Sequence, residues 1–197
     1  MDNLTGIVLM GGKSSRMLED KSLINYNGKA QFEFIHELLR EFCAEVYLSV
    51  KSPFKSDLPL IFDSEKYQNI GPLAGLISAF ESKKSAFLVL AIDYPLIDKL
   101  EIEKLISERD LSSVASVFYN TESSFFEPFL GIYEESFFEI LVHEIQHENY
   151  SLQNILSKNK VKKVFPLKNE SLKNINSQAE KIEFLKGFND AVGIKYL

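Results

Sequence analysis

The chain has 197 residues, and its 22 Lys and Arg against 28 Asp and Glu give a formal net charge of −6. Hydrophobic residues make up 45% of it and charged residues 25%, which is typical of a folded globular protein. The acidic balance argues against nucleic acid as a partner, and no apolar run reaches the ~18 residues of a membrane span. Cys43 is the only cysteine, so no internal disulfide forms. With no signal-peptide pattern, this predicts a cytoplasmic protein.

The first part of the chain alternates strands with helices. Leu4–Met10 is predicted to be a buried strand, because it is short, apolar and followed by Gly11-Gly12. Apolar residues recur at three- and four-residue steps within Phe32–Cys43, which is the pattern of an amphipathic helix. Strands are expected again at Val46–Val50 and Leu60–Phe62.

A second helix and the most apolar strand follow. Gly71-Pro72 opens a helix that runs through Phe80, with the proline suited to the first helical position. Ala86–Ile92 is a nearly unbroken apolar run, as expected for a central strand covered on both faces. Pro128 is expected to delay a later strand until Phe129. The remaining expected strands are Val114–Phe118, Phe129–Tyr133 and Val161–Phe165, and the remaining helices are Ile102–Ser107, Ser136–His147, Leu152–Leu156 and Gln178–Lys186, the last capped by Ser177.

This alternation predicts an α/β fold in which a mostly parallel sheet is flanked by helices. No repeat, low-complexity tract or linker interrupts the pattern, so residues 1–197 are expected to form a single domain. Ligands of such sheets bind beyond the carboxyl ends of the strands. The segments that directly follow the predicted strands are therefore the candidates for a functional site.

The segment after the first strand has the composition of a phosphate-binding loop. Leu9-Met10-Gly11-Gly12 lets the backbone approach a ligand and exposes its N–H groups, and Lys13, Arg16 and Lys21 add three cations within nine residues. The spacing matches neither the Walker loop nor the dinucleotide fingerprint. The alternative is a glycine turn with solvated charges.

Two carboxylates follow other strands. Asp93 comes directly after the most apolar strand, where it is suited to hold Mg²⁺ together with phosphate oxygens. Asp63 follows Leu60–Phe62, and its two oxygens could accept the paired N–H groups of a guanine edge. Either residue could instead be an ordinary turn residue. Glu127 could face a second substrate or be a solvated loop acid.

One motif points to a different class of enzyme. His143-Glu144-Ile145-Gln146-His147 matches the H-E-x-x-H pattern of zinc hydrolases on a predicted helix. The third histidine, His36, is more than a hundred residues away and no further ligand has a distinctive context. A solvated histidine pair beside the apolar stripe of the helix is the simpler interpretation.

Five segments follow one another along the chain and together resemble one family. They are Leu9-Met10-Gly11-Gly12 with Arg16-Met17 and Asp20-Lys21, then Asp63, Gly71-Pro72-Leu73-Ala74-Gly75, Ile92-Asp93-Tyr94-Pro95 and Asn174-Ile175-Asn176-Ser177. In this order they look like the molybdenum cofactor guanylyltransferase (MobA) family. The resemblance implies a Rossmann-like nucleotidyltransferase fold. It also implies transfer of GMP from Mg·GTP to the phosphate of molybdopterin cofactor, with release of pyrophosphate.

The resemblance assigns roles by position. It implies that Arg16, Lys21 and Asp93 are catalytic and that Asp93 holds Mg²⁺. The implied nucleotide contacts are Leu9, Met10, Gly11, Gly12, Lys21, Ser49, Asp63, Gly71 and Asp93, and the implied acceptor contacts are Asn174 and Asn176. GTP and molybdopterin are the implied substrates, with room for cofactor-delivery proteins or molybdoenzyme chaperones as partners.

The chain departs from the family pattern at several positions. Ser49 stands where the family usually has a nucleotide-binding Asn, and Glu127-Pro128 replaces the usual His-Pro. Ser177-Gln178 replaces the usual Thr-Pro. Three alternatives stay open from the residues: a nucleotidyltransferase with another base, such as a cytidylyltransferase, a non-catalytic nucleotide-binding protein, and the zinc hydrolase.

Overall fold

The computed structural model describes residues 4–10 and 29–175 of the chain. The expected helix Gln178–Lys186 and its cap Ser177 lie outside the described residues. The elements in chain order are β1 (Leu4–Leu9), α1 (Gln31–Arg40), β2 (Glu45–Val50), β3 (Leu60–Phe62), the 3-10 helix η3 (Glu65–Tyr67), α2 (Leu73–Ser82), β4 (Ala86–Ala91), α3 (Lys99–Ser107), β5 (Ala115–Asn120), β6 (Phe125–Tyr133), α4 (Phe137–Gln146), α5 (Leu152–Lys158), β7 (Val161–Val164) and the 3-10 helix η4 (Asn169–Leu172).

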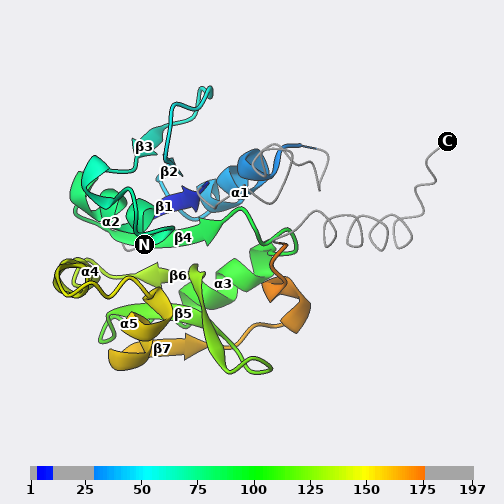
Figure 1. Ribbon diagram of the computed structural model, residues 1–197. Helices are drawn as coiled ribbons and strands as arrows, with labels where there is room; N and C mark the ends of the chain where they lie inside the picture. Colours follow the sequence, from blue (N-terminus) through cyan, green and yellow to red (C-terminus); the bar gives the residue numbers. More distant parts are fainter. Residues whose placement is uncertain (1–3, 11–28, 176–197) are drawn as a thin grey trace.

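The described strands form one seven-stranded sheet in the order β3-β2-β1-β4-β6-β5-β7. Neighbouring strands are parallel except at β6, which runs antiparallel to both β4 and β5. The predicted α/β fold with a mostly parallel sheet is therefore confirmed. In Figure 1, β1, β2 and β3 with α1 and α2 make up the upper half of the molecule, and β5, β6 and β7 with α5 make up the lower half.

The centre of the sheet is buried on both faces. Every residue of β1 is buried, and so is every residue of β4 after Ala86. A side chain built on Gly6 would place its Cβ 3.3 Å from Leu39 of α1, whereas Leu9 approaches Gly75 of α2. Because side chains alternate between the two faces of a strand, α1 and α2 cover opposite faces of the sheet. Because helices cover both faces of the sheet here, β1 and β4 are apolar along nearly their whole length.

One strand begins earlier than the sequence predicts. Pro128 was expected to exclude strand structure before Phe129, but β6 begins at Phe125 and passes through the proline. The ladder between β5 and β6 shifts register here, so that Glu127, Pro128 and Phe129 lack a register partner in the described strands on either side. The missing N–H of Pro128 therefore breaks no ladder hydrogen bond. Its carbonyl accepts a hydrogen bond from the hydroxyl of Tyr133.

Helix boundaries differ from the prediction where a capping residue decides them. The helix expected at Ile102–Ser107 begins at Lys99, because the Asp98 carboxylate accepts the Glu101 N–H at 3.0 Å. Pro72 is the residue before α2 rather than its first helical residue. None of the described helices is long and apolar enough to cross a membrane.

The buried carboxylate of Glu101 holds the last described segment of the chain against helix α3. Glu101 of α3 is 1% exposed, and its two oxygens accept the backbone N–H groups of Leu167 and Lys168, each at 2.9 Å. These bonds fix the chain just before η4. The residues that follow η4 are thereby carried back to the centre of the sheet, where the N–H of Ile175 donates to the carbonyl of Asp93 at 2.9 Å.

Replacing Glu101 with Gln should lower the free energy of unfolding by about 2 kcal/mol, because the amide nitrogen cannot accept the second N–H and leaves it unsatisfied. Denaturant unfolding measures the change. Glu103→Gln, on the exposed side of the same helix, is the matched control and should change stability little. Equal losses in the two variants would contradict the anchoring role.

Candidate active site

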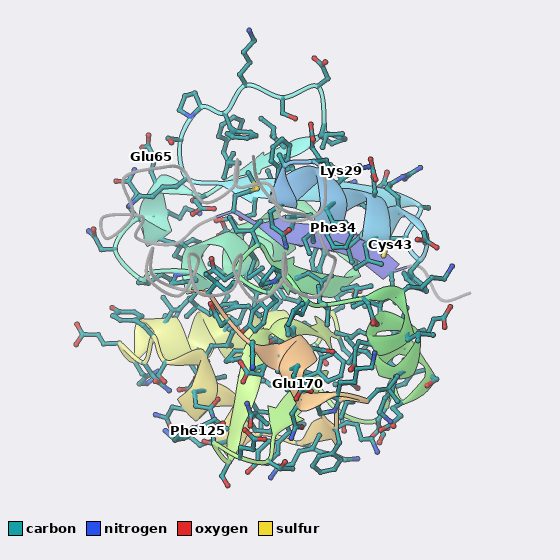
Figure 2. All side chains as sticks on the ribbon, turned by 90° about the vertical axis from the view of Figure 1, so that its right-hand side faces the viewer. Lys29, Phe34, Cys43, Glu65, Phe125 and Glu170 are labelled. Atoms are coloured by element: carbon teal, nitrogen blue, oxygen red, sulfur yellow. The ribbon has the colours of Figure 1, made fainter. Side chains whose placement is uncertain are left out.

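The carboxyl ends of the parallel strands share one edge of the sheet. The chain leaves β1 toward β2 and β3 on one side, and only then crosses to β4 on the other side of β1. In open α/β sheets, ligands bind at such a switch point, outside the carboxyl ends of the two strands, and this place between the ends of β1 and β4 is called the crevice below. Figure 2 faces this edge, and η4, marked by Glu170, lies on it.

Backbone hydrogen bonds fix the two strand ends that flank the crevice. The N–H of Met10 donates to the carbonyl of Ser49 at 3.1 Å, which ties the end of β1 to β2. On the other side, the N–H of Ile92 donates to the carbonyl of Leu9 at 3.3 Å. Leu9 and Met10 therefore lie beside the loop that carries Asp93, which is half-buried.

A second carboxylate lies on the β2–β3 side of the crevice. Ser49 at the end of β2 lies with its hydroxyl 3.2 Å from Asp63 Oδ1, in hydrogen-bond contact, and the N–H of Asp63 donates to the carbonyl of Val50 at 2.9 Å. Burial raises the pKa of the Asp63 carboxyl above its ordinary value, while the Ser49 hydrogen bond and the charge of Lys51 lower it. The structure thus places Ser49 and Asp63 side by side.

The glycine-rich start of α2 packs directly against this pair. A Cβ on Gly75 would lie 2.4 Å from Ser49 Oγ, 3.0 Å from a Leu9 methyl and 3.5 Å from Asp63 Oδ1. Glycine is therefore required for α2 to approach the ends of β1 and β2 so closely. Gly71 has a φ of +67°, a left-handed backbone that favours glycine, and it turns the chain into α2.

A polar cluster occupies the other side of the crevice. The hydroxyl of Tyr94, which is 2% exposed, donates to Glu127 Oε2 at 2.9 Å. The side-chain amide of Asn120 donates to Glu127 Oε1 at 3.3 Å. Burial raises the pKa of the Glu127 carboxyl, while the hydrogen bonds from Tyr94 and Asn120 lower it. Glu127 is thus held by two donors, which rules out the expectation of a freely solvated loop acid.

The sequence left part of this cluster unidentified. Asn120 belongs to no motif, and Tyr94 is notable in the sequence only as the residue that follows Asp93. Asn174 lies near the cluster, where it lowers the pKa of Tyr94 against the larger effect of burial, which raises it, and the bond between Ile175 and Asp93 holds the adjacent backbone. The one available signal was the departure from the family pattern at Glu127, which marks a changed polar environment.

The structure describes only some of the predicted site residues. Leu9, Met10, Ser49 and Asp63 lie together at the ends of β1, β2 and β3, and Asp93 and Asn174 lie together after β4. The predicted residues Gly11, Gly12, Arg16, Lys21 and Asn176 lie outside the described residues.

The histidine pair of the H-E-x-x-H motif is exposed at the C-terminal end of α4, with His143 in the helix and His147 directly after it. The two ring centroids are 4.3 Å apart, and Nδ1 of His147 lies 2.8 Å from the carbonyl oxygen of His143. Within residues 4–10 and 29–175, no three His, Cys, Asp or Glu side chains gather into a group that could hold a metal ion. The described part of the chain therefore supplies no third protein ligand for catalytic zinc.

The fold is that of the Rossmann-like nucleotidyltransferases, a class of enzymes that transfer a nucleotidyl group. Residues 6–163 match the model of the MobA-like NTP transferase domain. The chain belongs to this family.

Similar proteins agree with this assignment. The chain is 35% identical over 137 residues to a molybdenum cofactor biosynthesis bifunctional protein of Synechocystis sp.; the match covers 66% of this chain and 39% of that protein, less than half its length. It is 28% identical over 183 residues to a probable molybdenum cofactor guanylyltransferase of Flavobacterium johnsoniae, covering 91% and 95% of the two chains.

A solved structure shows the same fold. The molybdopterin-guanine dinucleotide biosynthesis protein A of Archaeoglobus fulgidus superposes with a TM-score of 0.76 at 21% identity, covering 96% of this chain and 99% of that one. At that identity, the likeness carries the fold alone.

Asp63→Asn should raise the melting midpoint at neutral pH. Because burial raises the folded-state pKa of Asp63, the folded protein loses stability as the pH rises through that pKa, and the neutral amide avoids this loss. The gain should shrink as the pH falls toward the ordinary carboxyl pKa of 3.8. Thermal unfolding between about pH 4 and about pH 8 measures it. Asp57→Asn, in an exposed loop, is the control for lost charge, and an equal gain there would contradict the burial argument.

Proposed function

We propose that this chain transfers GMP from GTP to the phosphate of molybdopterin, with release of pyrophosphate. The observation that carries the proposal is the arrangement of the crevice. A carboxylate suited to a nucleotide base lies on the β2–β3 side, Asp93 lies at the switch point, and a polar cluster suited to a second substrate lies on the β6 side. Family membership supports the choice of this reaction, since similar proteins are named molybdenum cofactor guanylyltransferases.

The Ser49–Asp63 pair is proposed to select the base. The hydrogen bond between Ser49 Oγ and Asp63 Oδ1 orients the carboxylate. A carboxylate has about four lone-pair sites, so both oxygens can still accept N–H groups from the guanine edge. A cytosine ring offers a single amino donor at the matching edge. This difference favours guanine over cytosine at Asp63.

Asp93 is proposed to hold Mg²⁺ with the phosphates of GTP. Its carboxylate is a hard oxygen donor, half-exposed at the crevice, and Mg²⁺ typically takes one or two carboxylates and completes its shell with phosphate oxygens and water. When bound, Mg²⁺ neutralises negative charge on the phosphates.

The remaining work falls to positioning and to charge. Phosphoryl-type transfer depends mainly on alignment of the two reactants and on stabilisation of developing charge. The backbone of Leu9 and Met10 is proposed to line the nucleotide, while Arg16 and Lys21 offset charge on the leaving pyrophosphate. Asn174 and Asn176 are proposed to orient molybdopterin. Residues 1–197 are proposed to act as one cytoplasmic catalytic unit, with a cofactor-delivery protein or molybdoenzyme chaperone as partner.

Incubation with GTP, Mg²⁺ and molybdopterin tests the function through the release of pyrophosphate. Release should require molybdopterin and should be much slower when CTP replaces GTP. Faster release with CTP would assign the chain to cytidylyl transfer, and no release with either nucleotide would contradict nucleotidyl transfer. Omission of Mg²⁺ should abolish the reaction, and its survival without any divalent cation would remove Mg²⁺ from the proposal.

Asp93→Ala should lower kcat by about 100-fold or more, a loss typical of removing one stabilising group from a transition state. The hydrogen bond from Ile175 uses the Asp93 backbone rather than its side chain, so the variant keeps this bond, and thermal unfolding checks that the variant is folded. Steady-state kinetics with GTP and molybdopterin measures the loss. Glu122→Gln, in an exposed turn, is the matched control. Full turnover by a folded Asp93→Ala variant would contradict the proposed role of Asp93.

A further inference from the structure

A groove between α2 and α4 lies at the amino ends of the parallel strands, away from the crevice. Tyr133 at the end of β6 pairs with Phe87 near the start of β4, so α4 begins at that edge of the sheet. The groove has a volume of about 540 Å³, and the rings of Phe80 and Phe138 in its lining stack with their centroids 6.0 Å apart. In Figure 1, α2 and α4 lie on the left, whereas Figure 2 faces the right-hand edge that carries the crevice. The groove is therefore separate from the candidate active site.

Charged side chains of both signs line the groove beside the two aromatic rings. Three lysines and three glutamates contribute, so the charge of the lining sums to zero, whereas the whole chain carries −6. The α2 side supplies Lys66, Glu81, Lys83 and Lys84, and the α4 side supplies Glu135 and Glu139. With three lysines against one glutamate, the α2 side is net basic, and the α4 side, which has two glutamates, is acidic.

Some of these charges have partners within the chain. Lys66 forms an ion pair with Glu81 at 3.4 Å, and Lys83 forms one with Glu45 at 2.7 Å. The ammonium of Lys83 also lies 4.7 Å from the centre of the Tyr47 ring. These side chains are held by their neighbours and form a fixed border on the α2 side of the groove.

The other three charged groups form no ion pair in the part of the chain that the structure describes. Lys84 follows the end of α2, and Glu135 and Glu139 flank the start of α4. All three are exposed. They line opposite sides of the same groove, yet the lysine pairs with neither glutamate. A partner that satisfies them must bring a carboxylate to one side of the groove and an ammonium to the other.

A second copy of the chain carries these charges in the required arrangement. In a symmetric dimer whose two-fold axis runs along the groove, each side of the groove meets the opposite side in the other copy. Lys84 of each copy then faces Glu135 and Glu139 of the other, and the contact is made twice. The apolar stem of Lys84 covers the half-buried Phe138 ring of the other copy, while its ammonium stays with the carboxylates.

We propose that this groove is the interface of a symmetric dimer and that its occupant is a second copy of the chain. Charge selects this occupant. An anion satisfies Lys84 and leaves the two glutamates unpaired, a cation does the reverse, and a second copy pairs all three with no net charge at the contact. The two crevices lie at the far edges of the dimer and stay open. The inference does not depend on the reaction that the chain catalyses.

Sedimentation velocity of the full chain measures the association directly. The mass of the wild-type protein should rise from that of a monomer to that of a dimer as its concentration is raised. A symmetric contact of this kind closes on itself, so association should stop at the dimer. A chain that stays monomeric up to its solubility limit, or that assembles without end, overturns the proposal.

Charge reversal tests whether this groove forms the dimer. Lys84→Glu sets like charges against each other at two symmetric contacts, so the dimer Kd should rise by about tenfold or more, and Glu139→Lys should act in the same way. Lys55→Glu makes the same change of charge in the exposed loop between β2 and β3. As the matched control, it should leave the Kd within about twofold of wild type. An equal rise for Lys84→Glu and Lys55→Glu, or no rise for either, places the contact elsewhere and overturns the proposal.

Mixing the two single variants gives a result that misfolding cannot imitate. In a mixed dimer of Lys84→Glu with Glu139→Lys, both contacts again join opposite charges. An equimolar mixture should therefore dimerise with a Kd within about threefold of wild type, although each variant alone associates weakly. The Lys84→Glu/Glu139→Lys double variant should dimerise by itself for the same reason. A mixture and a double variant that associate no better than the single variants contradict the proposal.

Discussion

The parallel pairing of β1 with both β2 and β4 is the constraint on which the rest of the structure depends. All six residues of β1 are buried, and its backbone is paired along both edges. A strand held in this way cannot slip by one residue without turning its apolar side chains to the wrong faces. The carboxyl ends of β1 and β4 therefore lie side by side. Strands β2 and β3 lie on one side of this pair, and β6, β5 and β7 lie on the other.

The two halves hold their polar groups by different means. On the β2 side, the short Ser49–Asp63 pair depends on the bare backbone of Gly75 to leave room for it. On the β6 side, hydrogen bonds join the buried Tyr94 to Gln31 and to Glu127, and join Glu127 in turn to Asn120. The first side is shaped by packing, and the second by a hydrogen-bonded network whose members constrain one another.

The sequence predicted the central strands, and the places of Asp63 and Asp93 just after strands, because these depend on local patterns. Buried strands are apolar and short, and polar residues that end them stand out. The path of β6 through Pro128 was not predictable, because an irregularity shared with β5 overrides the local preference of proline. The contacts among Tyr94, Asn120 and Glu127 were missed for a related reason. They join residues that no spacing rule connects, and only the paired strands bring them together.

The hydrogen bonds of Glu101 place few limits on the side chains of the two residues that it holds. The carboxylate accepts hydrogen bonds from the backbone N–H groups of Leu167 and Lys168. The interaction therefore does not depend on which side chains occupy these two positions. Nearly any residue can therefore occupy either position over evolutionary time while the path toward Asn174 is preserved. Proline is the exception, since it has no N–H to offer. The side chains of this segment can therefore change among related proteins while the path of its backbone stays the same.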